Sequence, residues 1–177
     1  MNRRKRYLCL VLGLVLLFAF LPEVSAADRA EEKAEVAKII DQSFCWFQNK
    51  DFDLLFRIMS DSPSLFLFQP TSTTTIIGGD AFKKYSVGWK NPDLVYDHHT
   101  IRDLRIDLSP KGEVAWFSCT ADDCSRFKGK IGCWKDVRVT GVLLKQEERW
   151  VIMQMHFSFA SDKVLAEEKA RQEAKKP

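Results

Sequence analysis

The sequence lacks the motifs that mark a metal or phosphate site. It has only three histidines and five cysteines, and none of them forms a Cys-x-x-Cys pair or a mixed His/Cys cluster with metal-site spacing. It also lacks a Gly-rich phosphate-binding loop and a Ser/His/Asp nucleophile arrangement. We therefore expect neither a bound metal ion nor a cofactor.

Long apolar runs are equally scarce, and the only one lies at residues 8–21, directly after the basic residues 3–6. Small residues at 24–26 stand where a signal peptidase cuts, so residues 1–26 are predicted to be a secretory signal peptide. A retained N-terminal anchor is the alternative. We expect an exported protein, periplasmic or secreted, without stable membrane insertion after cleavage.

The chain carries little net charge. Its 27 Lys and Arg residues and 24 Asp and Glu residues give +3. Cleavage would remove the four basic residues at 3–6 and the acidic Glu23, which leaves the mature chain neutral. This balance favours neither nucleic acid nor an anionic surface as a partner. The remaining length fits one domain, predicted at 27–161, with a charged tail at 162–177.

Helical periodicity comes first along the chain and strand periodicity follows. Helices are predicted at 28–49, 52–59 and 80–89. Two short strands are predicted at 65–68 and 71–77, and four longer strands at 94–108, 113–125, 131–145 and 150–160. This order predicts an α+β fold in which three N-terminal helices pack against a curved antiparallel sheet.

Turns centred on 110–111, 128–129 and 147–148 set a strand register that sorts side chains onto two faces. The face that we expect the helices to cover is apolar except at one end. Candidate ligand-binding residues at that end are Arg102, Arg138, Cys119, Thr140, His98 and Phe157. Arginines on an apolar face indicate a cavity that holds an anion such as a carboxylate. Alternatively, the arginines reach solvent at the rim or pair with Asp41, Asp122, Asp123 or Asp136.

The opposite face of the predicted sheet is too apolar for a surface in water. Its candidate interface residues are Trp116, Trp150, Ile152, Gln154 and His156. We expect a second copy of the chain to cover this face, sheet to sheet, in a homodimer. Cys124 and Cys133 pair directly in the same register, which predicts a cross-strand disulfide, with free thiols as the alternative.

Three segments resemble the nuclear transport factor 2-like superfamily and its SnoaL-like proteins. They are the helix-to-helix turn at 49–55, the step from a loop to the third helix at 78–82, and the closing hairpin with residues 138–140, 149–152 and 156–158. The last strand is also similar to that of the calcium/calmodulin-dependent kinase association domain, where a Trp leads to a spaced His and Ser. The resemblance implies a cone-shaped α+β barrel with an internal pocket and commonly a dimer. Its members include isomerases, cyclases, dehydratases and non-catalytic modules, so the fold does not settle the function.

A catalytic member of such a family needs a general base and an oxyanion donor in its cavity. His98 is the candidate base, Asp123 lies opposite it in the predicted register to orient it, and Tyr96 is the candidate donor. The alternative is a hydrogen-bonded pair at the cavity mouth. Three functions stay open: non-catalytic binding of a small molecule, an isomerase, cyclase or dehydratase, and a dimeric assembly module.

Overall fold

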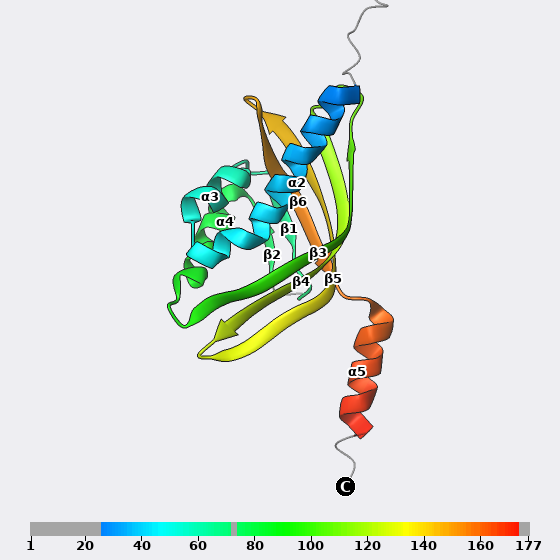
Figure 1. The fold of residues 1–177 in the computed structure, drawn as a ribbon. Coiled ribbons are helices and arrows are strands. Elements are labelled where there is room, and N and C mark those ends of the chain that lie inside the picture. Colours follow the sequence, from blue (N-terminus) through cyan, green and yellow to red (C-terminus); the bar gives the residue numbers. More distant parts are fainter. Residues whose placement is uncertain (1–25, 72–73, 174–177) are drawn as a thin grey trace, which may run out of the picture.

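The computed structural model describes residues 26–71 and 74–173 (Figure 1). The predicted signal peptide lies outside these residues, apart from Ala26. The helices are α2 (Ala26–Asn49), α3 (Phe52–Ile58), α4 (Gly79–Ser86), the 3₁₀ helix η1 (Val87–Lys90) and α5 (Ser161–Glu173). The strands are β1 (Phe66–Phe68), β2 (Thr75–Ile77), β3 (Leu94–Leu108), β4 (Val114–Phe127), β5 (Lys130–Gln146) and β6 (Arg149–Ser158). Within this described part, no helix is long and apolar enough to cross a membrane.

Helices α2 and α3 form for reasons that are visible in the sequence. Val36, Ile40 and Phe44 recur every four residues along α2, and all three are buried against the sheet. Helix α3 begins at an N-cap, where the Asp51 carboxylate accepts a hydrogen bond from the Leu54 backbone N–H at 2.8 Å. Both predicted helices are confirmed.

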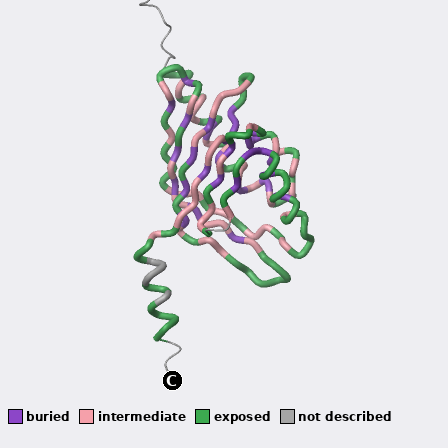
Figure 2. Tube along the Cα trace, turned by 180° about the vertical axis from the view of Figure 1, so that it is seen from behind, coloured by how far each residue is buried: buried purple, intermediate pink, exposed green. Residues whose placement is uncertain are grey.

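The strands form one open sheet in the order β2-β1-β6-β5-β4-β3. Neighbouring strands are antiparallel except β1 and β6, which run parallel. The predicted α+β class is confirmed, because α2, α3 and α4 lie against one face of a curved sheet (Figure 1). The sheet is mixed and does not close into a barrel. Buried residues concentrate along the strands, whereas α5 projects away from the body and those of its residues whose burial is described are exposed (Figure 2).

Two of the three predicted turns are two-residue hairpin turns. At 128–129 the φ angles are 50° and 77°, and at 147–148 they are 48° and 63°, as a type I′ turn requires. The first turn is longer than predicted, because Leu108 pairs with Ala115, the partner that the predicted register gives to Ile106. A shift of two residues leaves every side chain on its predicted face.

Four β-bulges in the described strands change the register by one residue each. Two lie in β3, at Asp97 and Asp103, one lies in β5 near Asp136, and one lies in β6 at Met153. Asp103 and Asp136 have φ angles of 53° and 52°, a left-handed conformation that aspartate tolerates better than most residues. Each bulge moves the side chains beyond it to the other face of the sheet.

The predicted assignment of faces is therefore wrong over much of β5 and part of β6. Val139 and Leu143 of β5 are buried under the helices, although the predicted register places them on the outer face. Trp150 and Ile152 are likewise buried in the core and do not belong to an exposed interface. The Trp150 indole N–H donates a hydrogen bond to the Glu32 carboxylate of α2 at 2.6 Å, which fixes the ring beneath the helix.

Candidate functional site

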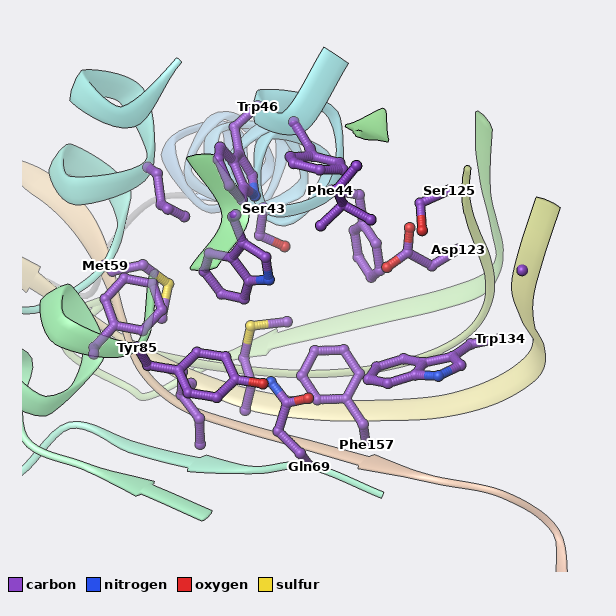
Figure 3. Close-up of a pocket in the computed structure, with 18 of the residues that line it drawn as sticks. Ser43, Phe44, Trp46, Met59, Gln69, Tyr85, Asp123, Ser125, Trp134 and Phe157 are labelled. Atoms are coloured by element: carbon purple, nitrogen blue, oxygen red, sulfur yellow. The ribbon is translucent and has the colours of Figure 1, made fainter. Parts of the chain in front are cut away.

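A cavity of about 570 Å³ lies between the helices and the inner face of the sheet (Figure 3). Its wall is mostly aromatic and aliphatic. The helices and the segment after them contribute Ser43, Phe44, Trp46, Phe47, Leu55, Met59, Phe82, Tyr85 and Trp89. The sheet and the residues that flank it contribute Leu67, Gln69, Leu94, Asp123, Ser125, Gly132, Cys133, Trp134, Met155 and Phe157. A cavity of this size and character suits an organic molecule with an apolar body.

Aromatic rings in tilted and edge-to-face contact form the helical side of the cavity. Trp89 of η1 lies between Trp46 of α2 and Tyr85 of α4, with both ring centroids 5.4 Å away. Phe82 contacts Trp89 edge to face at 6.0 Å. Because the η1 tryptophan touches two helices, the short α4–η1 segment is packed against α2.

Among the described residues, Asp123 is the only charged one in the cavity wall. Its carboxylate points into the cavity beside the Ser125 hydroxyl, above the rings of Trp134 and Phe157 (Figure 3). Burial raises the pKa of the Asp123 carboxyl, and the nearby His99 acts in the opposite direction. Among the described residues, no hydrogen-bond partner for this carboxylate is found. Asp123 is therefore the polar group that the cavity offers to a ligand.

His99, and not His98, lies next to Asp123 on the inner face. The bulge at Asp103, between the first turn and His98, turns His98 outward, where its Nδ1 lies 2.6 Å from an Asp97 carboxylate oxygen. His99 stacks on Phe44 with 5.6 Å between ring centroids. The predicted catalytic arrangement of His98 with Asp123 is therefore absent, since a histidine one residue later occupies the place opposite Asp123.

Both ring nitrogens of His99 already have partners. Nε2 lies 3.0 Å from the Asp41 carboxylate, and Nδ1 lies 2.9 Å from the Tyr96 hydroxyl. That hydroxyl also accepts the His99 backbone N–H at 3.1 Å, so it is free to donate its own proton to Nδ1. In neutral His99, Nε2–H then donates to Asp41. Tyr96 belongs to this network and not to the cavity wall, and its burial raises its pKa.

The two arginines predicted to hold an anion lie on the outer face of the sheet. Arg102 pairs with Thr120, which in turn pairs with Arg138, beyond the bulges that reverse the faces. The Arg102 guanidinium donates to both oxygens of Asp122 at 2.9 and 3.0 Å and to Asp136 at 2.9 Å. The alternative prediction, pairing with these aspartates, is the one that the structure shows for Arg102.

The other predicted residues divide between the cavity, the core and the outer face. Phe157 lines the cavity. Cys119 is a free thiol buried in the core, and its burial raises its pKa to about 11. Thr140 is exposed on the outer face, and Trp116, Gln154 and His156 share that face. The structure joins Cys124 to Cys133, directly opposite each other in β4 and β5, by a disulfide.

Sequence reasoning missed most of the residues that line the cavity. Phe44 and Trp46 belong to the periodicity of α2 and look like ordinary core residues. Trp134 and Ser125 lie between the turn at 128–129 and the bulge in β5, where the predicted register holds, so that register could have placed both on the cavity face. Aspartates lie at three of the four bulges, and Asp is unfavourable in regular strands, but the bulge at Met153 has no aspartate.

Solved structures with the same architecture place the chain in a fold class. A nuclear transport factor 2-like superfamily protein from Salmonella enterica serovar Typhimurium matches with a TM-score of 0.60 and 17% identity, over 73% of this chain and 91% of its own. A Novosphingobium aromaticivorans protein assigned as a scytalone dehydratase matches with a TM-score of 0.60 and 14% identity, over 72% of this chain and 83% of its own. An Exiguobacterium sibiricum protein assigned as a Ca/calmodulin-dependent kinase II association domain matches with a TM-score of 0.58 and 8% identity, over 72% of this chain and 92% of its own. The chain has the nuclear transport factor 2-like fold.

The family follows from the sequence match. Residues 36–162 match the SnoaL-like domain, and the chain belongs to that family. The resemblance seen in the sequence is therefore confirmed. A comparison with curated proteins finds no match. In the described residues, no group of three or more His, Cys, Asp or Glu side chains is arranged to hold a metal ion.

Proposed function

We propose that this SnoaL-like domain binds a small organic molecule with a ring-containing, apolar body in the cavity between α2, α3, α4 and the sheet. The observation that carries the proposal is the cavity of about 570 Å³ with its aromatic wall. Burial of an apolar ligand against such a wall is favourable, and the few polar groups would set its orientation. The anionic ligand expected from the sequence loses its support, because Arg102 and Arg138 lie on the outer face.

A variant that fills the cavity tests this proposal. The space at Gly132 is open, since no heavy atom would lie within 4 Å of an added Cβ, and the residue lines the cavity. Gly88 has the same open surroundings but lies outside the wall, so it supplies a matched control. We expect the neutral fluorescent probe N-phenyl-1-naphthylamine to bind the parent and Gly88→Leu equally, and Gly132→Leu about tenfold more weakly. No saturable binding by the parent, or unchanged binding by Gly132→Leu, would contradict the proposal.

A second candidate function, catalysis of an isomerase, cyclase or dehydratase type, is favoured by Asp123. A carboxylate with a raised pKa in an apolar cavity suits general base chemistry, and Asp123 replaces His98 as the candidate base. A structural neighbour is assigned as a scytalone dehydratase, which supports the type of chemistry only through fold. Deuterium exchange α to the carbonyl of cyclohexanone in D₂O, followed by NMR, tests it. Exchange that is no faster with the parent than with Asp123→Asn would argue against catalysis of this kind.

The homodimer predicted from the sequence is retained as a proposal for the outer face of the sheet. Trp116 is 48% exposed there, and Phe68 is 46% exposed where it contacts His156 edge to face at 5.2 Å. Half-exposed aromatic rings on one sheet face support contact with a second copy. Light scattering after size exclusion should give a dimer mass for the parent and a monomer mass for Trp116→Glu. A monomeric parent would contradict this proposal.

We place this function outside the cytoplasm. The signal-like residues 1–26 and the Cys124–Cys133 disulfide support export. N-terminal sequencing of protein from its own host should begin at Ala27. An intact N-terminus would favour the retained anchor instead.

A further inference from the structure

The cavity wall, as formed by the residues that the structure describes, carries one formal charge, and that charge is negative. Its residues include no lysine, arginine or histidine, so Asp123 alone sets the sign of the charge inside. An anionic ligand would have to enter an apolar space beside a carboxylate without any cation to neutralise it. The cavity is therefore suited to a neutral or a positively charged ligand.

Within the described part of the chain, no residue forms a hydrogen bond or an ion pair with Asp123. His99, directly opposite in the β3–β4 ladder, uses both ring nitrogens on Asp41 and Tyr96. The nearest cation along β4, Arg126, binds Asp97 through its Nε at 2.7 Å. A half-buried carboxylate in an apolar wall, without a hydrogen-bonded partner, is partly desolvated at a cost, so a group that comes with the ligand would relieve this cost.

Aromatic rings stand where such a group would lie. Trp134 pairs with Asp123 across β4 and β5, and its ring lies 6.0 Å from that of Phe157. Both rings line the cavity below the Asp123 carboxylate (Figure 3). The face of an aromatic ring attracts a cation, most strongly where water is excluded. A carboxylate above two rings is a suitable environment for an ammonium group.

We propose that the ligand of this cavity is an organic cation, whose ammonium group is held by the Asp123 carboxylate and the rings of Trp134 and Phe157. Its apolar body then extends toward Trp46 and Met59, on the helical side of the cavity. This inference rests on the proposed binding function and adds the charge of the ligand to it.

Three probes with one carbon skeleton and different charges test the inference. Isothermal titration at pH 7.5 would compare 4-phenylbutylammonium, 4-phenylbutanol and 4-phenylbutyrate on the full chain. We expect the ammonium to bind about tenfold more tightly than the alcohol, with the carboxylate weakest. In Asp123→Asn, which keeps the shape of the side chain, the ammonium should bind no better than the alcohol. The exposed Asp162→Asn is the matched control and should behave as the parent.

The outcomes separate this inference from the function on which it rests. Equal binding of the three probes, or tightest binding of the carboxylate, overturns the cationic ligand and leaves binding in the cavity intact. Binding of none of them, together with no binding of N-phenyl-1-naphthylamine, overturns both. An ammonium preference that survives in Asp123→Asn also overturns the role of Asp123.

A pH titration of the parent keeps the test decisive should Asp123→Asn fail to fold. Affinity for the ammonium should fall as the pH drops toward the pKa of Asp123, while affinity for the alcohol stays constant. The other titratable groups around Asp123 are His99 and Tyr96 from β3 and Asp41 and Cys45 from α2. Because protonated His99 would also repel the cation, the titration is repeated in His99→Gln. A fall that disappears in this variant assigns the effect to His99 and contradicts the role of Asp123.

Discussion

His99 lies opposite Asp123 in the β3–β4 ladder, and both residues lie on the face of the sheet that the helices cover. The regular register predicted from the turns would put His98 in that place. One extra residue in β3, at Asp103 between the first turn and the histidines, exchanges the faces of the two histidines. The exchange decides which histidine influences the carboxylate in the cavity.

The first prediction concerns this pair. Since His99 opposes the effect of burial on Asp123, His99→Gln should raise the pKa of the Asp123 carboxyl further above its ordinary value. Carbon-13 NMR titration of the aspartate carboxyls would measure the change. His98→Gln is the matched control, because His98 faces away and bonds to Asp97. An equal change in the two variants would show that the pairing is wrong.

The second prediction uses two glycines of β5. A Cβ at Gly141 would lie 2.4 Å from the Phe117 ring and 2.6 Å from the Gln154 carbonyl oxygen, so Gly141→Ala overfills the core. We expect a loss of about 1–3 kcal/mol in the free energy of unfolding. Gly132→Ala, which adds the same methyl group to open space, should change stability by less than about 0.5 kcal/mol. Urea denaturation measures both variants, and similar losses would contradict the assignment of faces in β5.

The third prediction separates two tryptophans that the sequence analysis assigns to one interface. Trp150→Phe removes the hydrogen bond to the Glu32 carboxylate and part of a buried ring, and should cost about 2–4 kcal/mol. Trp116→Phe, at a half-exposed ring, should cost less than about 0.5 kcal/mol at concentrations where the chain is monomeric. Thermal unfolding followed by circular dichroism compares them. A larger loss at Trp116 would place Trp116, not Trp150, in the core.

The fourth prediction is a pH dependence of stability. Hydrogen bonds from Arg102, assisted by the Asp136 backbone N–H, lower the pKa of Asp122 from 3.8 to about 2. A carboxyl whose pKa is lower in the folded state contributes stability above pH 4, and this contribution is lost as the pH falls toward 2. Because the pair is partly exposed, we expect a contribution of about 1 kcal/mol.

Asp122→Asn provides the comparison for this pH effect. The variant should be less stable than the parent at pH 6, and the difference should shrink between pH 4 and pH 2. Urea unfolding at a series of pH values measures the difference. A constant difference over this range would mean that the Asp122 carboxylate does not stabilise the fold through its charge.

Much of the fold could be predicted from the sequence because its signals are local. The four-residue spacing of Val36, Ile40 and Phe44 indicates one helical face, and Asp51 caps the next helix. The turn at 128–129 is indicated by Gly129, which accepts a positive φ angle. The turn at 147–148 is indicated by the short gap between two strand-like segments. These features depend on neighbours in the chain and not on distant contacts.

The candidate site could be predicted only in part. Asp123 and Phe157 lie on the face that the register predicts for them. Strand β4, which carries Asp123, contains no bulge, and the two bulges that affect Phe157, near Asp136 and at Met153, cancel each other. Arg102, Arg138 and His98 were assigned to the wrong face by single-residue shifts. Aspartates also occur in the regular parts of β3 and β4, so an Asp within a strand does not by itself identify a bulge.

By itself, the sequence determined the class of this protein: helices first, a long antiparallel meander after them, and a SnoaL-like pattern of residues. Only the tertiary structure decided which side chains enter the cavity. The physical reason is that alternation along a strand defines two faces but carries no information about an inserted residue. Bulges at Asp97, Asp103, Asp136 and Met153 set these faces, and Asp123 is the single charge that the described residues place in the aromatic cavity.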